Sequence, residues 1–212
     1  MKLYSFFNSS TSYRVRIALA LKGLPFDYEG VNIRTLEHRT DDYVAKNPNA
    51  NVPLLVDEDM NLGQSLAIID YLDRKHPIPR LIPQDGPSRS RVLELSYQIA
   101  TDIHPVNNLR ILKYLVKELG VSDEQKNAWY AHWVKEGLSA TEALLSAHGF
   151  GSYCFGDTPS MADCCLVPQV VNAQRMNCDL SAYKNVMRVY EFCQQQDAFQ
   201  QAAPNRQPDF QA

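Results

Sequence analysis

Apolar residues in the first third of the chain switch between strand-like and helix-like spacing. Short runs of β-forming residues predict strands at 3–7, 26–33, 52–56 and 60–62. Helices are expected at 11–22, at about 34–46, where the segment is polar, and after residue 65. Ser65 is expected to cap the third of these helices. A helical crossover between the first two strands makes them parallel. The pattern predicts a small mixed sheet with helices on its faces.

The pattern changes after residue 78, where strand signals end. Pro79, Pro83, Gly86 and Pro87 mark residues 79–87 as a linker, because such density stops helices. Beyond the linker, apolar residues recur three and four positions apart. We therefore expect an α/β domain at 1–78 and an all-helical domain at 88–212.

Several local signals predict where these later helices begin, bend and end. Pro105 is expected to kink or interrupt the first, and Pro168 to break a later one. Capping boxes open helices after Ser122, with Trp129 and Trp133 on the buried face, and after Ser160. A last helix is expected around 186–193, and the tail from 202 onward reads as irregular.

Composition narrows the classes of function. The 212 residues are 45% hydrophobic and 21% charged, with a net charge of −3, which argues against nucleic-acid binding. No apolar run is long enough for a membrane span, and Met1–Lys2 leads directly into a strand, so no signal peptide is expected. The five cysteines are odd in number and form no C-x-x-C pair, which indicates reduced thiols and a cytoplasmic protein.

The hydroxyl-rich segment at 9–12 is the clearest candidate for chemistry. Ser9, Ser10 and Thr11 stand where a strand becomes a helix, and the free N–H groups of a helix start suit an anion. If that anion is a thiolate, the hydroxyls stabilise it as a nucleophile. The segment has no cysteine, so the sulfur must arrive on a ligand. Simple helix capping is the alternative interpretation of the same residues.

Three motifs resemble the cytosolic glutathione transferases, which combine a thioredoxin-like N-terminal domain with an all-α C-terminal domain. Val52-Pro53 is similar to the cis-proline dipeptide of that family, and Gln64-Ser65 to its γ-glutamyl site. Ser160 to Asp163 resembles the capping box of its helical domain. The resemblance implies glutathione as cofactor and a homodimer.

The opening segment is similar to the zeta class of that family. Ser9, Ser10 and Thr11 align with a Ser-Ser-Cys triplet, with Thr11 in place of the cysteine. The stretches at 102–108 and 168–170, Arg175 and the terminal 207–209 also resemble zeta-class isomerases. Asn8 departs from this pattern, because members often carry arginine immediately before the first serine.

The resemblance implies a role for each candidate residue. Ser9 is the first choice as donor to the thiolate, and Ser10 and Thr11 support it. The residues implied for glutathione binding are Ser9, Val52, Pro53, Gln64, Ser65, Asp102, His104 and Asn108. For the substrate they are Arg175, Asn8 and Arg110, Arg175 being the best carboxylate anchor.

Some charged residues have simpler interpretations. Arg14 and Arg16 are expected to form structural ion pairs near the first helix. His132 and Glu136 have helix-face spacing but no third ligand, so no metal site is expected. For His104, an acid–base role and a structural hydrogen bond at the Pro105 kink both stay open.

The implied function is glutathione-dependent cis–trans isomerisation of maleylacetoacetate, a small dicarboxylic keto acid, to fumarylacetoacetate. Thiolate addition, rotation about the resulting single bond and elimination would accomplish it. Maleylpyruvate is the alternative substrate. Conjugation of glutathione to electrophiles, as in other transferases, is a second function to be tested, and a non-enzymatic binding module a third. No nucleic-acid or membrane partner is expected.

Overall fold

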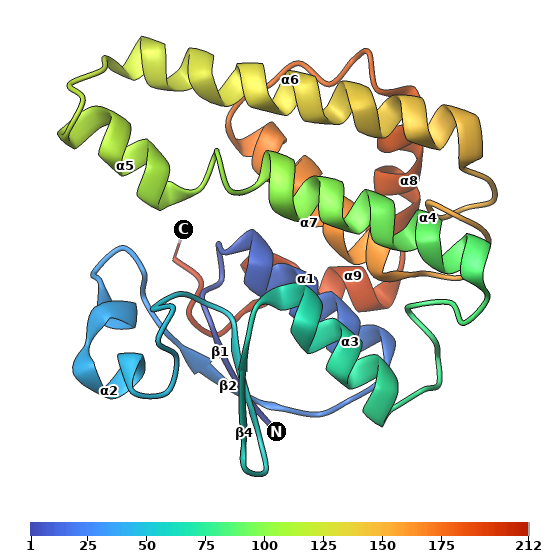
Figure 1. Cartoon of the computed structure of the whole chain (residues 1–212), viewed down its shortest axis with the longest axis horizontal. Helices are drawn as coiled ribbons and strands as arrows, with labels where there is room; N and C mark the ends of the chain where they lie inside the picture. Colours follow the sequence, from blue (N-terminus) through green and yellow to red (C-terminus); the bar gives the residue numbers. More distant parts are fainter. Residues whose placement is uncertain (212) are drawn as a thin grey trace. The chain divides into compact units, whose positions relative to one another are not determined.

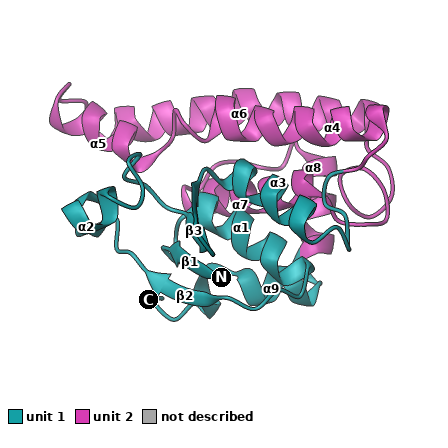
Figure 2. Ribbon diagram, turned by 60° about the horizontal axis from the view of Figure 1, so that its bottom comes forward, with its two compact units in different colours: residues 1–82, 194–212 teal, residues 83–193 magenta. Residues whose placement is uncertain are grey.

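The computed structural model describes residues 1–211, which divide into two compact units. Unit 1 comprises residues 1–82 and 194–212, and unit 2 comprises residues 83–193 (Figure 2). The predicted boundaries differ from this division at the C-terminal end. The sequence predicts residues 194–211 as part of the helical domain, whereas their contacts join them to unit 1.

Unit 1 contains a four-stranded sheet with helices packed on it (Figure 1). Its main elements are β1 (Lys2–Ser5), α1 (Ser10–Leu21), β2 (Asp27–Gly30), α2 (Asp41–Val44), β3 (Leu54–Asp57), β4 (Met60–Gly63), α3 (Ser65–Lys75) and α9 (Asp197–Ala202). Short 3₁₀ turns η1 (Glu37–Arg39) and η3 (Pro204–Arg206) complete it. The strand order is β2-β1-β3-β4. β1 and β2 are parallel, as the crossover requires, and the other pairs are antiparallel.

The two faces of the sheet bury different side chains because neighbouring strand residues point to opposite sides. On one face, Leu3 of β1 and its partner Leu55 of β3 pack against Val15 and Leu19 of α1 and against α3. On the other face, a separate apolar cluster contains Phe6, Phe7, Val31, Tyr43, Val52 and Leu54. The segment that leads into α1 therefore lies over the sheet face opposite α1 and α3.

Unit 2 is helical, as the periodicity predicted. Its elements are α4 (Gly86–Tyr97), a π-helical turn η2 (Gln98–Ile103), α5 (Leu109–Lys117), α6 (Asp123–His148), α7 (Met161–Arg175) and α8 (Lys184–Gln194), whose last residue falls in unit 1. Both predicted capping boxes are confirmed, at Ser122 with Gln125 and at Ser160 with Asp163. No helix within residues 1–211 combines the length and apolar character needed to cross a membrane.

Several local expectations are corrected. Ser65 is the first helical residue of α3, and Gln64 is its N-cap. Pro168 lies inside the unbroken helix α7, whose almost complete burial stabilises it despite the lost hydrogen bond. Trp129 and Trp133 are only half-buried. The predicted helix at 34–46 is reduced to η1 and α2, because Leu36 adopts a left-handed backbone conformation with φ of 67°.

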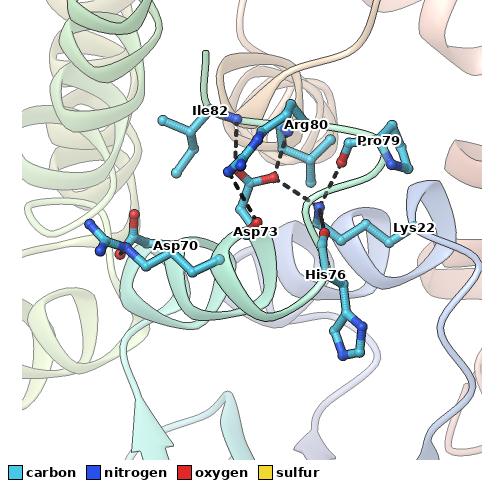
Figure 3. A network of polar contacts seen from close by, with 9 residues as sticks. Lys22, Asp70, Asp73, His76, Pro79, Arg80 and Ile82 are labelled. Atoms are coloured by element: carbon cyan, nitrogen blue, oxygen red, sulfur yellow. Dashed lines mark hydrogen bonds and ion pairs between the residues drawn. The ribbon is translucent and has the colours of Figure 1, made fainter. Parts of the chain in front are cut away.

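A buried ion pair holds the start of the predicted linker to unit 1 (Figure 3). Lys22 Nζ donates to Asp73 Oδ1 at 2.8 Å and to the carbonyls of His76 and Pro79 at 2.8 and 2.7 Å. Asp73 in turn accepts the backbone N–H of Leu81 at 2.7 Å. Because Lys22 uses three acceptors, its ammonium is compensated in spite of its burial. The five cysteines are free thiols, and all but Cys178 are buried.

Candidate functional site

The N-terminus of α1 is formed by the predicted hydroxyl cluster. Ser9 is the N-cap, and its Oγ accepts the N–H of Ser12 at 3.2 Å. Ser9 Oγ also lies 2.9 Å from Thr11 Oγ1, which donates to the carbonyl oxygen of Val52 at 2.9 Å. Because Thr11 gives its only hydroxyl proton to Val52, Ser9 is the donor in the Ser9–Thr11 hydrogen bond.

This chain of hydrogen bonds joins the predicted thiolate segment to the predicted cis-proline segment. The Val52–Pro53 peptide bond is cis, as the resemblance implied. The segment before Val52 is held by Tyr43 of α2 and by Asn47, which follows α2, because both donate to the Asn51 carbonyl, at 2.6 and 2.7 Å. Burial raises the pKa of Tyr43 to about 12, so its hydroxyl remains a donor at neutral pH. Sequence reasoning missed the part played by Tyr43.

The N-terminus of α3 forms the second anion-favouring position in unit 1. Gln64 is exposed, has φ of 65°, and makes no side-chain cap, so it does not occupy the N–H groups of the first turn. A non-glycine residue in this backbone region carries strain of the kind that gathers at binding sites. Ser65 is buried, and its Oγ accepts a hydrogen bond of 3.3 Å from the buried Arg14 Nη1.

In the structure, the two buried arginines of α1 hydrogen-bond to backbone carbonyls and serine hydroxyls. Arg16 hydrogen-bonds to the carbonyls of Phe6, Phe7 and Ala202 and to Ser5 Oγ, and among residues 1–211 it pairs with no carboxylate, in contrast to the expected ion pair. Burial lowers the pKa of Arg16 to about 10, which still leaves the guanidinium charged at neutral pH. Arg14 places a cation beside Ser65 at the start of α3, where it favours an anion.

Unit 1 therefore brings together six of the predicted residues: Ser9, Ser10, Thr11, Val52, Pro53 and Ser65. Ser10 is buried in the first turn of α1, and Asn8, half-buried, precedes the cap. Two helix N-termini, hydroxyls and a buried cation suit a ligand with a carboxylate and a thiolate, as in glutathione. The residues present fit that group.

In unit 2, three candidate residues lie within or shortly after the π-helical turn. Nε2 of His104 is 3.2 Å from Nδ2 of Asn108, and since an amide nitrogen only donates, the ring nitrogen accepts. This side-chain contact spans Pro105. Asp102 is exposed and accepts from Thr101 Oγ1 at 2.8 Å. Pro105 ends the helical run, and Asn108 caps α5.

The two substrate candidates in unit 2 are exposed. Arg110 lies in the first turn of α5 and Arg175 is the last residue of α7. Nη2 of Arg175 donates to Asn172 Oδ1 at 3.0 Å. Burial raises the pKa of Tyr130 to about 12, although the charge of Arg175 acts in the opposite direction. Arg175 thus lies near a neutral phenol that sequence reasoning did not single out.

Within residues 1–211 no three His, Cys, Asp or Glu side chains gather as a metal-binding group.

Comparison with known proteins identifies the fold as that of a glutathione S-transferase. Residues 1–74 match the family model described as the glutathione S-transferase N-terminal domain. A holo structure titled maleyl pyruvate isomerase, a bacterial zeta-class glutathione S-transferase, superposes with a TM-score of 0.97 at 46% identity and covers all of both chains. These matches confirm the predicted class, a thioredoxin-like domain with a helical domain.

Individual relatives are similar over nearly their whole length. A maleylpyruvate isomerase from Ralstonia is 47% identical over 99% of both chains. A probable maleylacetoacetate isomerase from Vibrio cholerae is 46% identical over 98% of this chain and 97% of its own. A Methylobacterium extorquens maleylacetoacetate isomerase, solved with malonate and glutathione bound, is 34% identical, has a TM-score of 0.96 and covers both chains fully. This chain belongs to the zeta class of the glutathione S-transferase family.

Proposed function

We propose that this protein is a glutathione-dependent cis–trans isomerase that converts maleylacetoacetate to fumarylacetoacetate. The observation that carries the proposal is the hydrogen-bonded connection of the α1 N-terminus to both other glutathione motifs, through Thr11–Val52 and Arg14–Ser65. The chain's similarity to maleylacetoacetate and maleylpyruvate isomerases supports the reaction type.

Residues of unit 1 would hold glutathione. The first-turn N–H groups of α3 and the Ser65 hydroxyl are donors for its γ-glutamyl carboxylate. The buried Arg14 places a positive charge beside Ser65. The backbone of Val52 would pair with its cysteinyl residue. Exposed Gln64 stands beside Ser65, and Asp102, His104 and Asn108 are proposed as further contacts from unit 2.

Ser9 would stabilise the sulfur anion. When bound, glutathione supplies a nucleophile whose reversible attack makes the substrate double bond rotatable and which is then released unchanged. The Ser9 proton lies toward Thr11 in the free protein. An anion is a stronger acceptor than a neutral hydroxyl, roughly by a factor of two, so Ser9 can turn its proton to the sulfur. Ser10 and Thr11 keep the cap in place while it does so.

The remaining requirement is a cationic anchor for a substrate with two carboxylates. We assign this to Arg175, with Arg110 and Asn8 in supporting roles, because a guanidinium binds a carboxylate through two parallel hydrogen bonds. Asn172 Oδ1 accepts a hydrogen bond from Arg175 and so orients the guanidinium without neutralising it. No general base is needed if the nucleophile is used already ionised.

Maleylpyruvate is the second candidate substrate, favoured by the 46–47% identity to maleylpyruvate isomerases. Steady-state kinetics of the purified protein with glutathione on both compounds would decide between them. Turnover of either that depends on glutathione supports the isomerase. If both compounds stay unchanged while glutathione binds, the isomerase proposal is wrong and conjugation of electrophiles takes its place. If calorimetry detects no glutathione binding, the binding-module alternative gains support.

We further propose that the protein is a homodimer in the cytoplasm, as the family resemblance implies. Sedimentation equilibrium at several concentrations tests the first point. Cell fractionation of the source organism tests the second.

A further inference from the structure

The C-terminal segment folds back onto unit 1 beside the start of α1. After α9 and η3, Gln207 Nε2 donates to the carbonyls of Gln201 and Ala203 at 3.0 and 2.8 Å, which fixes the direction of the chain. The segment then reaches β2 at Asp209. Asp209 lies there between β2 and the segment that precedes Ser9.

Asp209 uses both carboxylate oxygens. Its Oδ1 accepts the Tyr28 hydroxyl of β2 at 2.5 Å, and its Oδ2 accepts the backbone N–H of Phe7 at 3.0 Å. The approach is close, because a Cβ placed on Gly30 would lie 3.2 Å from the Cβ of Asp209. The Phe210 ring packs edge-on against the Phe7 ring, with centroids 5.4 Å apart. These contacts fix the carboxylate in a single place.

The Phe7 peptide is consequently held from both of its sides. Its N–H is bound by Asp209, and its carbonyl accepts Nη2 of Arg16 at 3.0 Å. The carbonyl of Phe6 accepts Nη1 of Arg16 at 3.3 Å and also the N–H of Ser9 at 2.9 Å. Arg16 Nε is itself tied to the C-terminal segment through the carbonyl of Ala202, at 3.0 Å. The backbone leading into Ser9 is thus held between Arg16 and Asp209.

We propose that Asp209 is a positioning residue for the Ser9 hydroxyl, acting through the Phe7 N–H. The inference rests on the proposed role of Ser9 toward glutathione sulfur and extends that site to the C-terminal segment. Ser9 must hold its donor within hydrogen-bonding distance of the sulfur, and displacements of about 1 Å at such a group reduce rates by up to about a hundredfold. Without Asp209, the Phe7 N–H loses its acceptor and the segment before Ser9 gains freedom.

The test compares Asp209→Ala with Asp209→Asn and with the matched control Asp59→Ala, an exposed aspartate of the same unit. An asparagine can keep both hydrogen bonds, because its oxygen accepts from Phe7 while its NH₂ donates to the Tyr28 oxygen. Three quantities are measured: kcat for the isomerisation, KM for glutathione, and the pKa of the bound glutathione thiol from its ultraviolet thiolate absorbance.

We expect Asp209→Ala to lower kcat about tenfold and to raise the pKa of the bound thiol by about one, with KM for glutathione changed less than about threefold. Asp209→Asn should restore both values, and Asp59→Ala should match the wild type. Wild-type kcat and thiol pKa in Asp209→Ala overturn the proposal. An Asp209→Asn variant as impaired as Asp209→Ala overturns it as well, because charge and not positioning would then be responsible.

If Asp209→Ala does not fold, Tyr28→Phe provides the second test. This variant removes the hydroxyl that holds Oδ1 of Asp209, so the carboxylate is fixed less firmly at the Phe7 N–H, and kcat should fall about two- to threefold with a small rise of the thiol pKa. Unchanged values in a folded Tyr28→Phe protein overturn the proposal. Failure of the proposed function can be distinguished from failure of this inference. In the first case, the wild-type protein would bind glutathione and ionise its thiol without isomerising either substrate.

Discussion

The two units hold their candidate site residues in different ways. In unit 1, hydroxyls, carbonyls and buried arginines bind one another, as in Ser9–Thr11–Val52 and Arg14–Ser65. In unit 2, Asp102, Arg110 and Arg175 are exposed on helix ends. The comparison indicates that hydrogen bonds within unit 1 position its proposed glutathione residues, whereas the proposed substrate residues Arg110 and Arg175 are long, exposed side chains at helix ends.

Two helices show the same difference. α1 buries nine of its 12 residues, and these include both of its arginines. α5 buries none of its nine residues, although its sequence is strongly amphipathic. Burial of charge in α1 is tolerated because each of the three guanidinium nitrogens of Arg16 donates to at least one oxygen. Substitutions in α1 should therefore change both the free energy of unfolding and kcat. Substitutions in unit 2 should change one of these quantities without the other.

The largest effect is expected from Ser9→Ala. Loss of one preorganised donor to an anion lowers kcat by about 10²- to 10³-fold in comparable sites, and loss of the cap lowers the unfolding free energy by about 1 kcal/mol. The control is Ser122→Ala, which removes an equivalent N-cap from α6 in unit 2. It should cost similar stability in urea unfolding and leave kcat unchanged. Equal kcat values in the two variants would remove Ser9 from the mechanism.

Arg175→Ala should come next and should separate two reactions. Loss of a charge-assisted carboxylate contact, worth about 1.5–3 kcal/mol, would lower kcat/KM for isomerisation by roughly 10- to 100-fold. Conjugation of glutathione to a neutral aryl halide should persist, because that substrate has no carboxylate. Lys184→Ala, which removes an exposed cation from the same unit, is the control. A parallel loss of both reactions would argue against the role as substrate anchor.

Ser65→Ala should affect binding more than chemistry. One hydroxyl donor to the γ-glutamyl carboxylate is worth about 1–1.5 kcal/mol, so KM for glutathione should rise about five- to tenfold. Its kcat should stay within about twofold, since the contact is the same in the ground and transition states. Initial rates over a range of glutathione concentrations measure both. Ser139→Ala, on the exposed side of α6, is the comparison and should show neither change.

The smallest effect concerns stability at low pH. Hydrogen bonds from Lys75 and Tyr71 lower the pKa of Asp57, with the Lys75 bond as the main cause. The folded pKa lies below the unfolded value of about 4, so this stabilisation is present at neutral pH and is lost as the pH falls through the folded pKa. Asp57→Asn should lower the urea midpoint at pH 7 and have little effect near pH 2. An effect independent of pH would exclude this linkage.

Local structure was largely predictable from the residues themselves. The strands at 2–5, 54–57 and 60–63 follow from short apolar runs, and the α6 and α7 starts follow from their capping boxes. Errors arose where local signals were overridden. Pro168 lies inside a buried helix without breaking it. The polar sequence around Leu36 forms short turns in place of one long helix. α9 was missed because its packing against α1, and not its own short sequence, stabilises it.

The sequence alone determined which chemistry was available: a hydroxyl cluster at a helix start, no local cysteine, and two motifs typical of glutathione sites. Only the tertiary structure decided which of these groups meet. Thr11 binds Val52 across 41 positions, Arg14 binds Ser65 across 51, and Asp209 binds Phe7 across 202. Such contacts have no local signature, because they depend on how the chain closes around the sheet and not on the residues beside them.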